Sequence, residues 1–226
     1  MGMDLNVRIP DKVALHDFIT ISKKLGLTGL GTQTCSSLME EEDGQSIYKR
    51  IQLSGTKLGK LKSVIASQRY QATIIALTVG SLAISNWAAG DSRVDLLTLP
   101  ESGKYKLKKS TARLASNTGT ALEVIIAPLL KTKGLSRSLI LKGYRTSVKT
   151  ALAAKMDVVI SSGAKTPYQM RSPKALSHIG YILGLNQQQA DRAIFDIPER
   201  IVRYNQERLN RDIITRGLEI RRQQTE

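Results

Sequence analysis

Residues 72–98, ATIIALTVGSLAISNWAAGDSRVDLLT, decide the fold of this chain. The apolar, β-branched run at 72–79 predicts a strand, a helix-like run follows at 81–89, and the apolar run at 94–98 predicts a second strand. Apolar strands that alternate with helices are typical of a parallel sheet that is buried on both faces. This stretch therefore predicts an α/β fold.

The same alternation covers most of the chain. Further strands are expected at 3–8, 27–32, 47–53, 121–126 and 158–160. Further helices are expected at 13–25, 56–68, 108–116, 136–155, 172–183 and 186–195. About seven strand–helix units favour a TIM-like β/α barrel of about seven parallel strands, and an open doubly wound sheet is the alternative.

The same pattern predicts the domain organisation. No repeat, low-complexity tract or linker divides the chain, so residues 1–204 are expected to form a single β/α barrel domain. Residues 205–226 are expected to form a helical tail that extends from the core and can be mobile. The acidic stretch 40–44 is expected to be a surface turn.

The uncharged segment from Gln71 to Gly90 is about as long as a membrane span. Its polar residues and its internal glycine favour a buried strand, turn and helix over a transmembrane helix. The chain does not open with a basic start and an apolar stretch, so no signal peptide is expected. The single cysteine, Cys35, excludes an internal disulfide and fits a reducing compartment. We therefore expect a cytoplasmic protein without membrane attachment.

The positive charge is concentrated in one part of the sequence. The net charge of the chain is +15, and residues 104–174 hold 15 Lys and Arg against only Glu123 and Asp157. Ordinary solvated surfaces mix both signs, so such a block predicts a polyanionic partner. Nucleic acid is the favoured partner, because no basic amphipathic helix with bulky apolar anchors indicates a membrane. A general contribution to solubility is the alternative.

Motifs of enzyme chemistry are weak. Gly26–Gly31 has the glycines of a dinucleotide-binding loop in the wrong order, and Gly55–Leu61 lacks the Ser or Thr with which a P-loop contacts magnesium. Only His16 and His178 are present, whereas a metal-dependent hydrolase needs several convergent His and carboxylate ligands. We therefore expect no catalytic residue and no metal site.

The loop Ser161–Ala164 is a better candidate for a binding site. It follows the last expected strand, at the end where β/α barrels place their functional loops. Serine hydroxyls and glycine amides can bind phosphate there, close to Lys165, Arg171 and Lys174 and to the start of a helix. The alternative is a tight turn whose backbone angles require Gly163.

This region resembles the C-terminal signature of the ribonuclease P protein component 3 family, the archaeal counterpart of the eukaryotic thirty-kilodalton RNase P subunit. The family pattern is an apolar strand that ends in Ser-Ser-(Ala/Gly)-Ala, a basic Arg-x-Pro turn, and two short helices joined by Leu-Gly-Leu. The matching residues here are Val158–Ala164, Met170–Pro173, Ile179–Leu185 and Ala190–Ile194. The resemblance spans most of residues 1–204 and is specific mainly at 158–194.

The resemblance implies a barrel related to the metal-dependent phosphoesterases of the polymerase-and-histidinol-phosphatase class. Those enzymes open with a strand that reads Asp-x-His-x-His, whereas the equivalent positions here read Asp4-Leu5-Asn6-Val7-Arg8. An amide and a cation replace the two metal-binding histidines, and the cation would repel a metal. This departure favours a scaffold without metal chemistry, so no cofactor is expected on this chain.

The resemblance also implies a function. In ribonuclease P the RNA subunit removes the 5′ leader of precursor tRNA with magnesium that is bound by RNA. Proteins of this family bind that RNA and meet precursor tRNA indirectly. They pair with a small ferredoxin-like protein subunit, and a two-plus-two assembly is expected.

We therefore expect a protein subunit of ribonuclease P that binds the catalytic RNA through its phosphates. The expected RNA-binding residues are Arg50, Lys108, Lys109, Arg113, Ser161, Ser162, Lys165, Arg171 and Lys174. The alternative is a barrel phosphoesterase that uses the Ser161–Ala164 loop and turns over a small phosphate ester without RNA. A third hypothesis is an architectural protein whose basic face meets an acidic protein.

Overall fold

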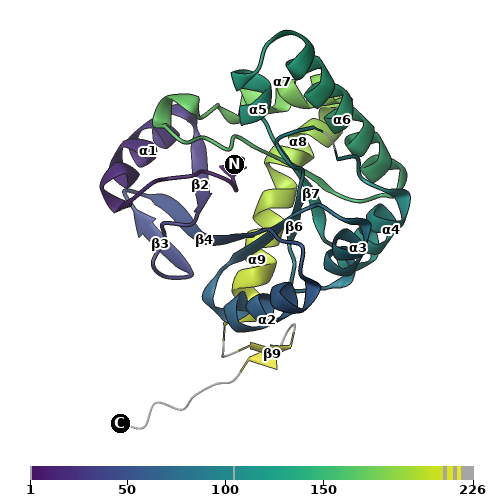
Figure 1. Cartoon of the computed structure of the whole chain (residues 1–226). Helices are drawn as coiled ribbons and strands as arrows, with labels where there is room; N and C mark the ends of the chain where they lie inside the picture. The colour runs from purple at the N-terminus through teal and green to yellow at the C-terminus, as the bar shows by residue number, and fades with distance from the viewer. Residues whose placement is uncertain (1, 104, 211–212, 216–217, 220–226) are drawn as a thin grey trace, which may run out of the picture.

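Parallel strands form a barrel in the computed structural model, which describes residues 2–103, 105–210, 213–215 and 218–219. The strands are β1 (Gly2–Asp4), β2 (Leu27–Thr32), β4 (Gln45–Leu53), β5 (Ile74–Thr78), β6 (Leu96–Thr98), β7 (Ala121–Ile125) and β8 (Val158–Ser161). They pair in the order β1-β2-β4-β5-β6-β7-β8, and every pair is parallel. Figure 1 shows the sheet curling around a central axis, with helices outside it. The predicted TIM-like barrel of about seven parallel strands is confirmed.

Short contacts after β1 close the barrel at the carboxyl ends of the strands. Val7 forms a parallel bridge to Ala164, and the Arg8 N–H donates to the Ala164 carbonyl at 2.8 Å. The strand predicted at 3–8 is therefore interrupted, because only its first part pairs as β1 and only Val7 resumes the ladder.

The helices lie close to their predicted positions. They are α1 (Lys12–Leu25), α2 (Leu58–Gln68), α3 (Leu82–Gly90), α4 (Lys109–Thr118), α5 (Ala127–Lys131), α6 (Gly134–Ala153), α7 (Pro173–Leu183), α8 (Gln187–Ile194) and α9 (Asp196–Leu209), with short 3₁₀ turns η1 (Arg69–Gln71) and η2 (Pro167–Gln169). Asp11 caps α1 by accepting the Ala14 N–H at 2.9 Å, and Gly26 ends it with φ at +75°. The prediction missed α5, because Pro128 was taken only as the end of a strand.

The uncharged segment 71–90 folds into β5 and α3, as its glycine and polar residues predict. The helix α3 has nine residues. Among the residues that the structure describes, no helix has both the length and the apolar composition needed to cross a membrane.

The acidic stretch 40–44 is a hairpin, and the prediction of a simple surface turn is wrong. Strand β3 (Met39–Glu42) pairs antiparallel with β4 and extends the sheet at its side. Asp43 and Gly44 alone form the turn, with φ at +53° and +72°. An Asp-Gly pair with two positive φ angles is the preferred two-residue connection between antiparallel strands, so these two residues carried the hairpin signal.

Helix α9 covers the amino-terminal end of the barrel. Its apolar residues Ile197, Ile201 and Val202 pack against the side chains that point into the barrel. Those side chains are Leu5, Tyr48, Ile74, Ala76, Leu96, Ala121 and Val159. The Asn205 side chain anchors the helix by donating to the Thr73 carbonyl at 2.9 Å.

The domain boundary predicted at residue 204 falls inside α9, which packs against the barrel. Within the predicted helical tail, the helix α9 continues up to Leu209. Residues 213–215 and 218–219 instead form the antiparallel strands β9 and β10 (Figure 1). The rest of the predicted tail after Asn210 lies outside the described residues.

Candidate functional site

The carboxyl-terminal end of the barrel contains two layers of polar residues. The inner layer, which we call the Glu123 cluster, is buried inside the barrel mouth. It consists of Asn6, Arg50, Gln52, Thr98, Glu123 and Ser161. The outer layer is a set of mostly exposed Lys and Arg residues in the loops and helices that follow the strands.

An ion pair forms the centre of the Glu123 cluster. The Arg50 side chain is 2% exposed and that of Glu123 is 0% exposed. Arg50 donates to both carboxylate oxygens of Glu123, with Nη1–Oε1 at 2.8 Å and Nη2–Oε2 at 2.6 Å. The hydroxyls of Thr98 and Ser161 donate to the same carboxylate at 2.7 and 2.8 Å. Burial raises the pKa of Glu123, but the Arg50 charge and these hydrogen bonds outweigh it and lower the pKa below its ordinary value.

Asp4 lies beside the cluster with only part of its carboxylate satisfied. Its Oδ1 accepts the Asn6 N–H at 3.2 Å and the Ser162 N–H at 3.0 Å. Its Oδ2 is buried and has no hydrogen-bond partner among the described residues. Burial, assisted by the negative charge of Glu123, raises the pKa of Asp4 to about 6.

The raised pKa of Asp4 makes stability depend on pH. The folded state binds the proton up to about pH 6, whereas an unfolded Asp releases it near 3.8, so this residue lowers stability as pH rises through that interval. Asp4→Asn removes this titration. The quantity to compare is the free energy of unfolding of Asp4→Asn minus that of the wild type. We expect this difference to be about 3 kcal/mol larger on the neutral side of the interval than on its acidic side.

Urea denaturation of both proteins across this interval measures the effect. The difference between them cancels the titration of groups that the substitution leaves unchanged. A difference that stays constant with pH would contradict the cost assigned to burying the Asp4 charge.

Arg50 was predicted to bind RNA, but the structure places it in the Glu123 cluster. Its guanidinium is buried in the barrel, where it also donates to the Leu5 carbonyl at 2.8 Å and to Gln52 Oε1 at 2.5 Å. The residue type suggested a phosphate contact, but its place on β4 directs the side chain inward. Glu123 was not among the predicted site residues, although a single carboxylate within an apolar strand was a signal for it.

The loop Ser161–Ala164, which was predicted to bind phosphate, lies inside the protein, where most of its donors already have acceptors. Ser161 and Ser162 are 0% and 1% exposed. The Ser162 N–H donates to Asp4, the Gly163 N–H to the Asn6 carbonyl at 2.9 Å, and the Ala164 N–H to Ser162 Oγ at 3.0 Å. The loop therefore closes the barrel, and its buried serines and amides are turned toward the protein interior.

Gly163 has the backbone geometry that the alternative reading of this loop required. Its φ is +65°, which lies in the left-handed region that residues with a Cβ rarely adopt. A Cβ at this position would lie 2.2 Å from Cγ2 of Ile125. The tight turn thus explains the glycine without a ligand.

Asn6 and Arg8 occupy the two positions that hold histidines in the metal-binding motif, and here both contact other residues of the chain. Asn6 Nδ2 donates to Glu123 Oε2 at 3.3 Å. Arg8 forms an ion pair with Glu101 at 2.5 Å on the outer edge of the mouth. Within the described ranges, no three His, Cys, Asp or Glu side chains are grouped so that they could hold a metal ion.

The outer layer, which we call the basic rim, lies on the three neighbouring segments that follow β6, β7 and β8, partly in loops and partly in helices. Strands β6, β7 and β8 are adjacent, so the segments that follow them meet at one edge of the barrel mouth. The basic rim consists of Lys106, Lys108, Lys109, Lys131, Lys133, Arg137, Lys165, Arg171 and Lys174. All are exposed except Arg171, which is half-buried, and none is in an ion pair within the described part of the chain.

The structure thus brings together five of the nine predicted residues, Lys108, Lys109, Lys165, Arg171 and Lys174. Arg113 is exposed but lies one turn further along α4. Prediction from sequence missed Lys131, Lys133 and Arg137, although their position directly after a strand could have indicated them. More cations follow on the exposed side of α6 at Lys142, Arg145 and Lys149. The positive charge therefore covers one sector of the barrel.

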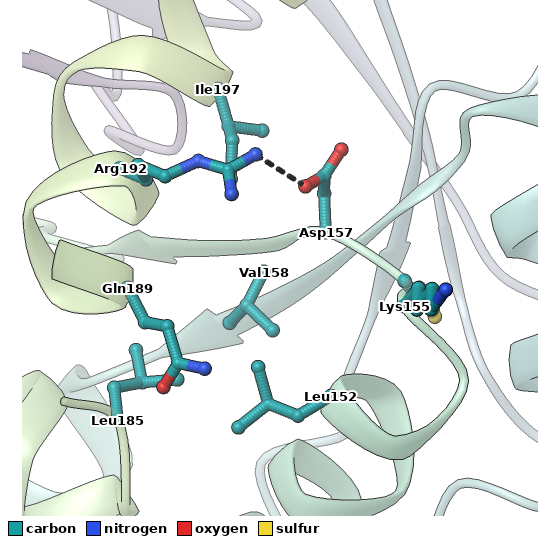
Figure 2. Close-up of a pocket in the computed structure, with 9 residues that line it drawn as sticks. Leu152, Lys155, Asp157, Val158, Leu185, Gln189, Arg192 and Ile197 are labelled. Carbon is teal, nitrogen blue, oxygen red and sulfur yellow. Dashed lines mark hydrogen bonds and ion pairs between the residues drawn. The ribbon is translucent and has the colours of Figure 1, made fainter.

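The opposite end of β8 has a cavity of about 480 Å³. Figure 2 shows Asp157 in the wall of this cavity, facing Arg192 of α8. Gln189 and Leu185 lie on the same side of the cavity as Arg192. Asp157 pairs with Arg192 at 3.5 Å and also with Arg200 of α9. These ion pairs hold α8 and α9 against the barrel, so we assign this region a structural role.

The comparisons with known proteins agree with this fold. The profile of the family described as RNase P subunit p30 matches residues 1–210. Ribonuclease P protein component 3 of Methanosarcina barkeri is 30% identical over 206 residues, which cover 87% of this chain and 86% of that protein. The protein of the same name from Methanosarcina acetivorans is 25% identical over 210 residues, covering 89% and 87% of the two chains.

A solved structure has the same fold. It is a chain in the cryo-EM structure of archaeal ribonuclease P with mature tRNA. The TM-score is 0.78 at 24% identity, and the match covers 98% of this chain and 100% of that chain.

Proposed function

This chain belongs to the RNase P subunit p30 family, and from that membership we propose that it binds the catalytic RNA of ribonuclease P as one of the enzyme's protein subunits. In this role it supports the removal of the 5′ leader from precursor tRNA, which it meets only indirectly. The basic rim is the observation that carries the proposal, because its cations form no ion pair with the described residues and lie on one sector of the barrel.

The rim residues bind phosphates of the RNA backbone. Such contacts fix the position of a protein on a nucleic acid without reading its bases, so weak sequence preference follows. The Glu123 cluster contributes to the scaffold, since its carboxylate and hydroxyls are already hydrogen-bonded to one another. In this proposal magnesium is bound by the RNA subunit, and this chain holds no cofactor.

We also propose a second protein subunit of the small, ferredoxin-like kind as a partner, in a two-plus-two assembly in the cytoplasm. Exposed leucines near the basic rim support a protein contact. Leu135 and Leu139 are 75% and 56% exposed and lie one turn apart on α6. The mass of the reconstituted protein complex, measured by light scattering, gives its stoichiometry.

Reconstitution of precursor-tRNA cleavage with and without this chain tests the proposed function. Omission of the chain is expected to lower the cleavage rate or to raise the magnesium concentration that cleavage requires, because the RNA fold loses its neutralising partner. If omission changes neither the rate nor the magnesium requirement, the proposed function is wrong.

A further inference from the structure

Tyr168 is a large aromatic side chain that the fold leaves almost entirely in solvent. It is 85% exposed and lies in the middle of η2, in the loop between β8 and α7. A tyrosine ring has a large apolar surface that is usually covered in a folded protein. Its position on the basic rim prompts the question of which ligand could cover it.

The loop holds the Tyr168 backbone in a defined position. The Arg171 guanidinium donates to the Tyr168 carbonyl at 3.0 Å and to the Met170 carbonyl at 2.7 Å. The Gln169 N–H donates to the Thr166 carbonyl at 3.0 Å. With its backbone fixed and only two side-chain torsions free, the ring can bind a partner at low cost in conformational entropy.

The loop is also anchored to the body of the protein. Met170 is 2% exposed and packs with Leu15 and Phe18 of α1. Figure 1 shows the green loop crossing from β8 to lie beside the purple helix α1 before the chain returns to α7. The ring therefore projects from a rigid platform.

The charge around Tyr168 favours a polyanion. Lys165 and Lys174 are exposed on either side of it in the sequence. Between Asp157 and Asp191 the chain contains no acidic residue. An aromatic ring beside cations on a rigid loop is how proteins bind unpaired nucleotides, with the base stacked on the ring and the phosphates held by the cations.

We propose that Tyr168 stacks on an unpaired base of the bound RNA, and that Lys165 binds a phosphate next to that base. This inference rests on the proposed function and goes beyond it, because it assigns a single-stranded element of the RNA to the β8–α7 loop. A protein partner that covers the ring is the competing explanation.

The test compares Tyr168→Ala and Tyr168→Phe with a matched control, Tyr70→Ala. Tyr70 is 75% exposed on η1, which precedes β5 and so lies at the opposite end of the barrel. The probes are the ribonuclease P RNA and a short oligoadenylate that carries 2-aminopurine, whose fluorescence falls when it stacks. A blunt RNA duplex of equal length serves as the comparison, because none of its paired bases is free to stack on the ring.

We expect Tyr168→Ala to weaken binding of the RNA and of the oligoadenylate by roughly 5- to 100-fold and to abolish the fluorescence change. Tyr168→Phe retains the ring and should bind like the wild type, as should Tyr70→Ala. The dependence of affinity on salt should stay the same in Tyr168→Ala, because no charge is removed. By contrast, Lys165→Gln should reduce the slope of log affinity against log salt by about one.

Equal affinity of Tyr168→Ala and wild type for both single-stranded probes would overturn the inference and leave the proposed function intact. The inference would also fail if Tyr168→Ala weakened only the binding of a protein subunit. If the wild-type chain bound no RNA in the same assay, the proposed function itself would fail.

Discussion

Glu123→Ala is expected to lower the free energy of unfolding by about 3–5 kcal/mol, because it leaves the Arg50 guanidinium buried without its carboxylate. Both side chains are at most 2% exposed, so water cannot replace the lost partner without opening the barrel mouth. The hydroxyls of Thr98 and Ser161 lose their acceptor in the same variant. Chemical denaturation at neutral pH measures the change.

Two further variants make this prediction specific. Glu101→Ala removes the partner of Arg8 in an ion pair whose side chains are 31% and 48% exposed, and it should cost at most about 1 kcal/mol. The double variant Arg50→Met with Glu123→Leu removes both charges and should recover much of the lost stability. A cost below about 1 kcal/mol for Glu123→Ala would contradict the cost assigned to burying Arg50 without its carboxylate.

The affinity for ribonuclease P RNA is expected to fall steeply with salt. If the basic rim neutralises about six to ten phosphates, affinity should drop on the order of 10³–10⁵ between about 50 and 200 mM salt, by the scaling for duplex DNA. Changing Lys131, Lys133 and Arg137 together to Gln should reduce the slope of log affinity against log salt by about 2–3.

The control for this variant removes an equal charge from the other end of the barrel. Lys23 and Lys24 are in the last turn of α1, and Lys155 follows the end of α6, so all three lie away from the rim. Changing these three residues to Gln should leave the slope close to that of the wild type. A flat salt response, or equal effects of the two triple variants, would show that the basic rim is not the RNA-binding surface.

The barrel could be predicted from the sequence because its strands are marked by composition. Strands β5 to β8 are mainly apolar and buried, as a sheet enclosed by helices requires, and each is separated from the next by a helical segment. The hairpin of β3 was missed, since its acidic residues look like a loop when the Asp43-Gly44 turn is not considered.

The candidate site could be predicted only in part. Exposed lysines on the rim follow from their position after the strands, whereas Arg50 and Ser161 have the right residue types but point into the barrel. Alternation along β4 would have placed Arg50 on the same face as Tyr48, which packs inside the barrel. The sequence could not show that donors of the Ser161–Ala164 loop already have acceptors. These acceptors lie far away in the sequence, as Asp4 does from Ser162.

The position of α9 has a consequence for biosynthesis. All seven parallel strands precede this helix in the sequence, so they leave the ribosome before the residues that seal their amino-terminal end. Until then the apolar interior that Ile197, Ile201 and Val202 cover remains accessible, and the nascent chain exposes surface that chaperones can recognise. Completion of the native state must therefore wait until the helix has been translated.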